Sequence, residues 1–192
     1  ARHHPDPAER SRADRVAALL TPVIKAGLTD MGFESAVGAQ QVFGGHGYIR
    51  EWGMEQYVRD ARIAQIYEGT NGIQAMDLVN RKLPLEDGAV VGTFFETIEA
   101  DLRAAPEIDV ADRTLIALAL LRRATGQVRE AQAEIAGAIA VDYLRLFTLV
   151  LLGWMWSRIA VGAAAEPTFK VKLATADFFA RRILSQADGL AV

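Results

Sequence analysis

One glutamate in the first half of the chain stands where a carboxylate could transfer protons. Glu68 lies between the apolar pair Ile66-Tyr67 and Gly69, at the junction between two helical patterns. Such a junction exposes backbone amides to a ligand, and Gly69 leaves space beside the carboxylate. The apolar neighbours could desolvate Glu68, which suits a carboxylate to proton transfer near neutral pH. A surface glutamate near a helix N-terminus has the same spacing, so the spacing alone leaves both interpretations open.

A glycine-rich segment precedes this glutamate. Gly44, Gly45 and Gly47 occupy three of four consecutive positions. Glycine lets the backbone turn tightly and approach a ligand closely, with N–H groups to offer. A helix that ends in glycine and continues as a loop is the simpler explanation of an isolated match.

The elements that must position these segments are helices. Apolar residues recur at three- and four-residue steps from Ala8 to about Thr29, which is one stripe of a helix. Pro22 predicts a kink or a break in this helix, and Gly32 predicts its end. Thr70 or Asn71 can cap the helix that follows Glu68. The helical patterns of this half then cover residues 35–43, 54–66 and 71–83.

The clearest boundary in the chain is residues 84–92, which hold a proline, two acids and two glycines. They predict a linker between residues 1–83 and residues 93–192. Long helices with short connections imply antiparallel neighbours, and no run alternates with the period of a strand. The predicted fold class is all-α, with antiparallel helical bundles, the second built from four helices. The expected helices of the second part cover residues 93–105, 110–137, 139–163 and 168–188.

Composition limits the possible function classes. The 192 residues carry a formal net charge of −3 and contain no cysteine. The charge gives no basic footprint for nucleic acid. The lack of cysteine excludes disulfides and thiolate metal sites, and it fits a reducing cytoplasm, where we expect the protein to lie.

Neither a membrane span nor a targeting segment is expected. The most apolar stretch, Leu146 to Trp156, is too short to cross a bilayer at roughly 20 residues and predicts a buried core helix. The N-terminus is not a signal peptide, since no apolar segment follows its charges. Because it does not start with Met, we expect a piece of a longer chain.

Three segments in order resemble one family. They are Gln41-Val-Phe-Gly-Gly-His-Gly-Tyr48, Tyr57-Val-Arg-Asp-Ala-Arg-Ile63 and Gln65-Ile-Tyr-Glu-Gly-Thr-Asn-Gly-Ile-Gln74. Their identity and spacing resemble the C-terminal helical domain of the acyl-CoA dehydrogenases, over about residues 8–83. In position and helical character, residues 93–192 resemble the extra C-terminal helical domain of some bacterial members.

The resemblance implies an enzyme and assigns its base. Glu68 would take the α-proton of an acyl-CoA thioester while the β-hydrogen leaves as hydride to FAD, giving a trans-2-enoyl-CoA. The backbone N–H of Glu68 would donate to the thioester carbonyl oxygen, which stabilises the developing enolate. Tyr67 and Gly69 would lie against the substrate.

The resemblance also implies cofactor contacts. Thr70 would contact FAD, while Gln41, Gly44 and Gly45 would touch the FAD of a neighbouring subunit, so the enzyme would be a homodimer or a larger homo-oligomer. Some relatives carry glutamine two residues after the threonine. Glycine stands there in this chain, and Asn71 could replace that contact.

The implied role is in fatty acid β-oxidation, with an electron-transfer flavoprotein as acceptor. An oxidase-like use of oxygen is an alternative. The family's remaining domains would lie upstream, so residues 1–192 alone are expected to bind FAD weakly or not at all and to be inactive. Two further alternatives are DNA binding by the second part, which the acidic balance disfavours, and a purely assembly or lid role for it.

Overall fold

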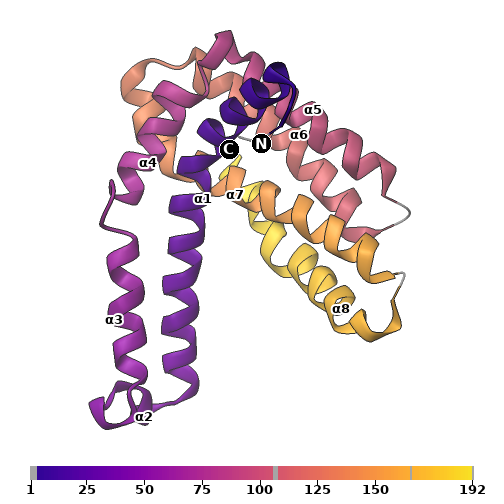
Figure 1. The fold of residues 1–192 in the computed structure, drawn as a ribbon. Coiled ribbons are helices and arrows are strands. Elements are labelled where there is room, and N and C mark those ends of the chain that lie inside the picture. Colours follow the sequence, from indigo (N-terminus) through magenta and orange to yellow (C-terminus); the bar gives the residue numbers. More distant parts are fainter. Residues whose placement is uncertain (1–3, 106–107, 165, 192) are drawn as a thin grey trace.

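The computed structural model describes residues 4–105, 108–164 and 166–191. Helices make up nearly all of this part of the chain, and it contains no strand (Figure 1). The prediction of an all-α fold is confirmed.

The helices of the N-terminal part lie on either side of the predicted site segments. They are α1 (Pro7–Val42), α2 (Gly45–Tyr48), η1 (Arg50–Trp52), α3 (Met54–Ala64), α4 (Asn71–Asp77) and η2 (Leu78–Lys82), a π-helical turn that continues α4. After the short turn η3 (Leu85–Gly88), the remaining elements are α5 (Ala89–Ala104), α6 (Asp109–Glu130), α7 (Ala133–Ala164), η4 (Pro167–Phe169), α8 (Lys170–Phe178), η5 (Phe179–Ile183), η6 (Leu184–Gln186) and α9 (Ala187–Leu190).

Helix α1 is longer than the sequence predicts. The Asp6 carboxylate caps it by accepting the Ala8 N–H at 2.8 Å, and the helix then runs through both Pro22 and Gly32. The predicted end at Gly32, with a separate helix over 35–43, is therefore wrong. A glycine within a helix costs only about 1 kcal/mol relative to alanine. At Pro22 the helix does not break, although its ribbon bends in the N-terminal half (Figure 1).

The C-terminal half of α1 and helix α3 lie side by side and project from the rest of the molecule, with α2 and η1 at the tip (Figure 1). We call residues 31–64 the arm. Arg62 of α3 lies over the Phe33 ring of α1, 5.7 Å from its centroid. None of the residues of α3 is buried. The arm therefore carries two of the three segments singled out in the sequence, residues 41–48 and 57–63.

The apolar core is continuous between the two parts of the chain. Leu146, Phe147 and Val150 of α7 are fully buried, and they belong to the same cluster as Leu19 of α1 and Leu78 of η2. The predicted core helix at 146–156 is thus confirmed as the centre of α7. Trp154 of this helix is also buried, and its indole N–H donates to Asp101 at 3.0 Å.

Glycines allow α7 to approach its neighbours closely. A Cβ on Gly27 of α1 would lie 2.4 Å from the Thr148 hydroxyl oxygen of α7. A Cβ on Gly137 of α7 would meet the Met76 side chain of α4 at 3.4 Å. Since these contacts involve α1 and α4, helix α7 supports the helix that follows the predicted base and the helix whose Lys25 contacts its turn.

The predicted boundary between the second and third helices of the C-terminal part is wrong. The sequence places it near residue 138, whereas α6 ends at Glu130 and α7 begins at Ala133. Ala131 turns the chain with extended backbone angles, and no glycine or proline marks it. Gly137 is a packing residue inside α7 and not a helix end. Within residues 84–92, α5 already begins at Ala89.

By length and composition, α1 and α7 could each cross a membrane. In α7, half of the most apolar window is buried inside the fold, as in the core helix of a soluble protein.

Candidate functional site

The turn between α3 and α4 has an unusual backbone. Glu68 has a φ of 54° and Gly69 a φ of 87°, so two consecutive residues are left-handed. For a residue with a Cβ this region costs roughly 1–2 kcal/mol. Such outliers concentrate at functional sites, where the surrounding structure holds them in place. Glu86 and Asp87 share the feature in the surface turn η3, so a positive φ alone does not identify a site.

Two side chains from outside the turn hold its carbonyl groups. The Gln74 side-chain amide donates to the Glu68 carbonyl oxygen at 3.1 Å, and Lys25 Nζ donates to the Gly69 carbonyl oxygen at 2.8 Å. Within the described residues, neither the Glu68 N–H nor its carboxylate makes a hydrogen bond or an ion pair. Among these residues, the carboxylate and the backbone amide of Glu68 are therefore both free to contact a ligand.

Glu68 is exposed in this chain, as are Tyr67 and Gly69 beside it. The desolvation expected from Ile66 and Tyr67 is not provided by the described residues, because both side chains are themselves about half exposed. Dry surroundings for the carboxylate would have to come from another part of the protein or from the ligand.

Thr70 and Asn71 both lie at the start of α4 but differ in their contacts. Thr70, one of the two predicted candidates, is the N-cap, and its hydroxyl oxygen accepts the Ile73 N–H at 3.4 Å. Asn71 faces α1 instead. Its side-chain amide donates to Asp30 Oδ1 at 2.6 Å, and its oxygen accepts from Lys25 Nζ at 2.8 Å. These bonds give Asn71 a structural role, and its contact with FAD stays a prediction.

The glycine-rich segment lies at the opposite end of α3 from Glu68 (Figure 1). Helix α3 has 11 residues, which at 1.5 Å per residue separate its two ends by about 16 Å. Within this chain Gln41, Gly44 and Gly45 therefore do not share a site with Glu68. The prediction that they serve a neighbouring subunit does not require them to do so.

Glycine is required at this tip for two different reasons. Gly44 has a φ of 60°, and a Cβ on Gly47 would lie 2.3 Å from the Gln40 carbonyl oxygen. Gly45 has neither a positive φ nor a neighbour within 4 Å of a Cβ. Nothing in the described part of the chain thus demands glycine at position 45, and the space beside it is open to a ligand or a partner.

The predicted flavin contacts fit FAD to different degrees. Gln41 and Gly45 are exposed, and the Gln41 side chain makes no hydrogen bond within the described residues. Thr70 is exposed too, with a hydroxyl proton still to donate. These residues are accessible and polar or small, as contacts to a cofactor must be. The Asn71 side chain fits less well, because α1 already uses its donor and acceptor.

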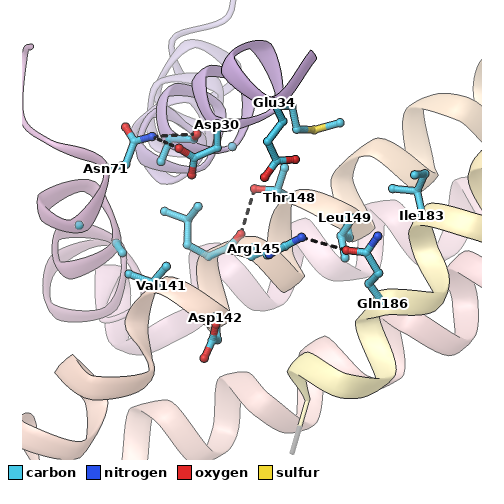
Figure 2. A pocket seen from close by; sticks show the side chains of 16 residues that line it. Asp30, Glu34, Asn71, Val141, Asp142, Arg145, Thr148, Leu149, Ile183 and Gln186 are labelled. Carbon is cyan, nitrogen blue, oxygen red and sulfur yellow. Dashed lines mark hydrogen bonds between the residues drawn. The ribbon is translucent and has the colours of Figure 1, made fainter. Parts of the chain in front are cut away.

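A cavity of about 250 Å³ lies beside Asn71 and Gly72, just after the turn that carries Glu68. It lies between α1, α4, α7 and η5–η6. Figure 2 shows Asn71 and Asp30 paired on one side of it and Arg145 donating to Gln186 on another, the latter pair at 2.9 Å. No sequence pattern predicts this cavity, since its walls come from both parts of the chain.

Three residues of the site were not predicted from the sequence: Lys25, Asp30 and Gln74. Gln74 is the last residue of the segment 65–74, so its place in that segment was a usable signal. Lys25 and Asp30 fall within an ordinary helix, Lys25 44 residues before Gly69 and Asp30 41 residues before Asn71. Only the packing of α1 on α4 reveals them.

The sequence of the chain matches two models of known protein families. The family model described as "Acyl-CoA dehydrogenase, C-terminal domain" matches residues 6–83. The model described as "Acetyl-CoA dehydrogenase C-terminal like" matches residues 94–192. The site residues fall within the first match, and α7 falls within the second.

Curated relatives match both parts together. A 3-methylmercaptopropionyl-CoA dehydrogenase of Ruegeria pomeroyi is 35% identical over 98% of the chain and 34% of its own length. The broad-specificity linear acyl-CoA dehydrogenase FadE5 of Mycobacterium tuberculosis is 29% identical over 90% of the chain and 32% of its own. A butyryl-CoA dehydrogenase of Syntrophomonas wolfei is 28% identical, over 96% and 33%. The chain thus spans about a third of the length of these relatives.

Proposed function

Since this chain belongs to the acyl-CoA dehydrogenase family, we propose that it supplies the catalytic base of an acyl-CoA dehydrogenase. Glu68 removes the α-proton of an acyl-CoA thioester, and the product is a trans-2-enoyl-CoA. Bound FAD supplies the hydride acceptor for the β-hydrogen. The observation that carries the proposal is the left-handed Glu68–Gly69 turn, whose free carboxylate and free amide lie within the family match.

The residues of the turn have separate tasks. The Glu68 carboxylate accepts the α-proton, and its backbone N–H donates to the thioester carbonyl oxygen, where negative charge develops. Gly69 leaves room for the thioester beside the carboxylate, and Tyr67 covers the substrate. Closing the site around the substrate excludes water, which strengthens both interactions.

The cofactor contacts come from two places on the chain. The Thr70 hydroxyl, at the start of α4, donates to FAD. Gln41, Gly44 and Gly45 contact the FAD of a neighbouring subunit. Support comes from the arm, where Val42 is 86% and Tyr48 82% exposed. Apolar side chains exposed over such a surface mark an interface. The enzyme is accordingly a homo-oligomer in which the arm is covered.

The test is a Glu68→Gln variant of the flavin-loaded enzyme that contains this chain. Glutamine keeps the size of the side chain but cannot accept the α-proton. We expect the variant to retain FAD and to lose the bleaching of flavin absorbance by acyl-CoA under anaerobic conditions. Glu96→Gln, an exposed site on α5, serves as the matched control and should bleach as the wild type does. Bleaching of Glu68→Gln at the wild-type rate would remove Glu68 from the mechanism.

The electron acceptor is a separate proposal. We assign it to an electron-transfer flavoprotein, with oxygen as the alternative in an oxidase-like enzyme. Mixing the substrate-reduced enzyme with air in a stopped-flow instrument separates the two. Slow reoxidation by air and fast reoxidation by an electron-transfer flavoprotein are expected, and fast reoxidation by air alone would favour the oxidase.

A further inference from the structure

We propose that Lys25 is a positioning residue for the base Glu68, an inference that rests on the proposed function. Lys25 lies half-buried on α1, and its ammonium group reaches the turn between α3 and α4. It donates to the Gly69 carbonyl oxygen and to Asn71 Oδ1, both at 2.8 Å. One cation therefore ties the residue after the base to the first residue of α4.

The turn needs such a tie because its conformation is costly. Glu68 and Gly69 are both left-handed, and only the glycine adopts that region without strain. A strained turn persists only where its surroundings hold it. The carbonyl oxygen of Gly69 is held by Lys25 and that of Glu68 by Gln74. Without Lys25 the turn can relax, and the Glu68 carboxylate then moves.

Both ends of the turn are fastened to the same carboxylate on α1. Asp30 Oδ1 accepts from Asn71 Nδ2 at 2.6 Å and from Gln65 Nε2 at 2.6 Å. Gln65 is the C-cap of α3, while Asn71 begins α4. Asp30 and Lys25 together therefore fix the turn at its two ends and near its middle. Figure 2 shows the Asp30–Asn71 pair.

We call Lys25 and Asp30 the clamp. The part of α1 that carries them is itself rigid. Gly27, two residues after Lys25, lies against Thr148 of α7 so closely that a Cβ would not fit. Because α7 is the central core helix, the α1 segment that carries Lys25 and Asp30 cannot shift easily. The Glu68 side chain is left as the free part of a fixed turn, which is the arrangement that proton transfer from a bound substrate to the carboxylate requires.

The first test compares variants of the flavin-loaded enzyme that contains this chain. Lys25→Met should lower kcat by roughly 10- to 100-fold, because an error of about 1 Å in the place of a base has an effect of that size. FAD content and KM should stay within about twofold of wild type, since the clamp places the base and binds no substrate. Lys25→Arg should restore part of kcat by donating to the same oxygen. Lys82→Met removes another half-buried ammonium, which pairs with Asp77 at 3.4 Å, and should leave kcat unchanged.

The second test needs no activity. Hydrogen exchange of the amides of residues 66–72 in the 192-residue chain should be faster in Lys25→Met and unchanged in Lys82→Met. A wild-type kcat in Lys25→Met, or unchanged exchange in that variant, would overturn the proposal. If the wild-type enzyme did not bleach with acyl-CoA, the proposed function would fail, while the exchange result would still support or overturn the clamp.

Discussion

Glu68 adopts a backbone conformation that glutamate rarely takes, and side chains distant in sequence hold it there. Lys25 precedes it on α1 and Gln74 follows it on α4, each donating to one carbonyl of the turn. The stability of this turn is therefore a tertiary property. It can be probed at the neighbouring glycine without removing the carboxylate.

Gly69→Ala should destabilise the protein. Gly69 has a φ of 87°, and a Cβ there would lie 2.9 Å from the Gln74 amide nitrogen that holds Glu68. The left-handed conformation alone should reduce the free energy of unfolding by roughly 1–2 kcal/mol. Gly72→Ala is the matched control, since Gly72 is inside α4 with nothing within 4 Å of a Cβ, and alanine there should stabilise by up to about 1 kcal/mol. Urea unfolding measures both, and equal stability of the two variants would contradict this view of the turn.

At this scale the sequence singles out Glu68 as a candidate base, but it does not reveal the surroundings of that residue. Glu68, Gly69 and Thr70 stand in a recognisable segment, and the N-cap role of Thr70 follows from its place before α4. The left-handed Glu68 could not be predicted, because a single glutamate has no local preference for that conformation. The contacts from Lys25 and Asp30 depend on how α1 crosses α4, which no local pattern specifies.

Among the elements, α7 is the one on which the others are arranged. It packs against α1 through Gly27 and Thr148, and against α6 through Gly153 and Thr114. The close approach at both places requires glycine. Helix α7 lies in the part of the chain that carries no predicted chemistry, yet it supports the helix that bears Lys25.

Gly27→Ala should therefore destabilise the α1–α7 contact. A Cβ would lie 2.4 Å from the Thr148 hydroxyl oxygen, and overpacking of this kind costs roughly 1–3 kcal/mol. Gly38→Ala lies on the same helix with open space around it and should be neutral or stabilising by about 0.5–1 kcal/mol. The free energies of unfolding of the two variants give the comparison. A Gly27→Ala variant as stable as Gly38→Ala would show that the contact is not tight.

A buried tyrosine between α6 and α7, Tyr143, should make the stability of the protein depend on pH in the alkaline range. Burial raises the pKa of Tyr143 above its ordinary value of 10.0, partly offset by the hydrogen bond to the Thr125 hydroxyl at 2.8 Å. Because the folded state resists ionisation, this tyrosine contributes its full stability below the unfolded pKa and loses it as pH rises towards the folded one. Tyr143→Phe should lose about 1 kcal/mol at pH 8 but decline less between pH ~10 and ~11.

The measurement is the free energy of unfolding of each protein across this pH range. Tyr57→Phe changes an exposed tyrosine on α3 and should keep the wild-type decline. A decline in Tyr143→Phe as steep as in the wild type would assign the alkaline transition to other groups.

Helix existence was easier to predict than helix ends. The apolar periodicity of α1, α3 and α7 was clear, but the helix end predicted at Gly32 and the helix boundary predicted near residue 138 both lie inside helices. The true break at Ala131 carries no residue that terminates helices. Packing against other helices decides these ends, and glycine within a helix often marks close approach instead.

On the scale of the whole molecule, the described chain is a core with an uncovered arm. The buried cluster joins both parts of the chain, while α3 has no buried residue. The chain spans about a third of the length of its curated relatives, so the substrate, the electron acceptor and the cofactor of the whole protein stay proposals.

The arm should become protected when the enzyme assembles. Amides of α3 in the isolated 192-residue chain should exchange quickly, because few buried contacts oppose local opening. In the flavin-loaded enzyme the same amides should exchange at least ~10-fold more slowly, while the amides at the centre of α7 serve as the internal reference. Equal exchange of α3 in both would mean that nothing covers the arm.

The central claim, that the Glu68 carboxylate takes the proton next to a thioester, is tested most directly in D₂O. The flavin-loaded enzyme is incubated anaerobically with an acyl-CoA analogue that cannot lose its β-hydrogen, and deuterium at the α-carbon is followed by mass spectrometry. The wild type and Glu96→Gln should both exchange the α-proton, and Glu68→Gln should not, while all three retain FAD. Deuterium entering the α-carbon with Glu68→Gln as fast as with the wild type would contradict the account.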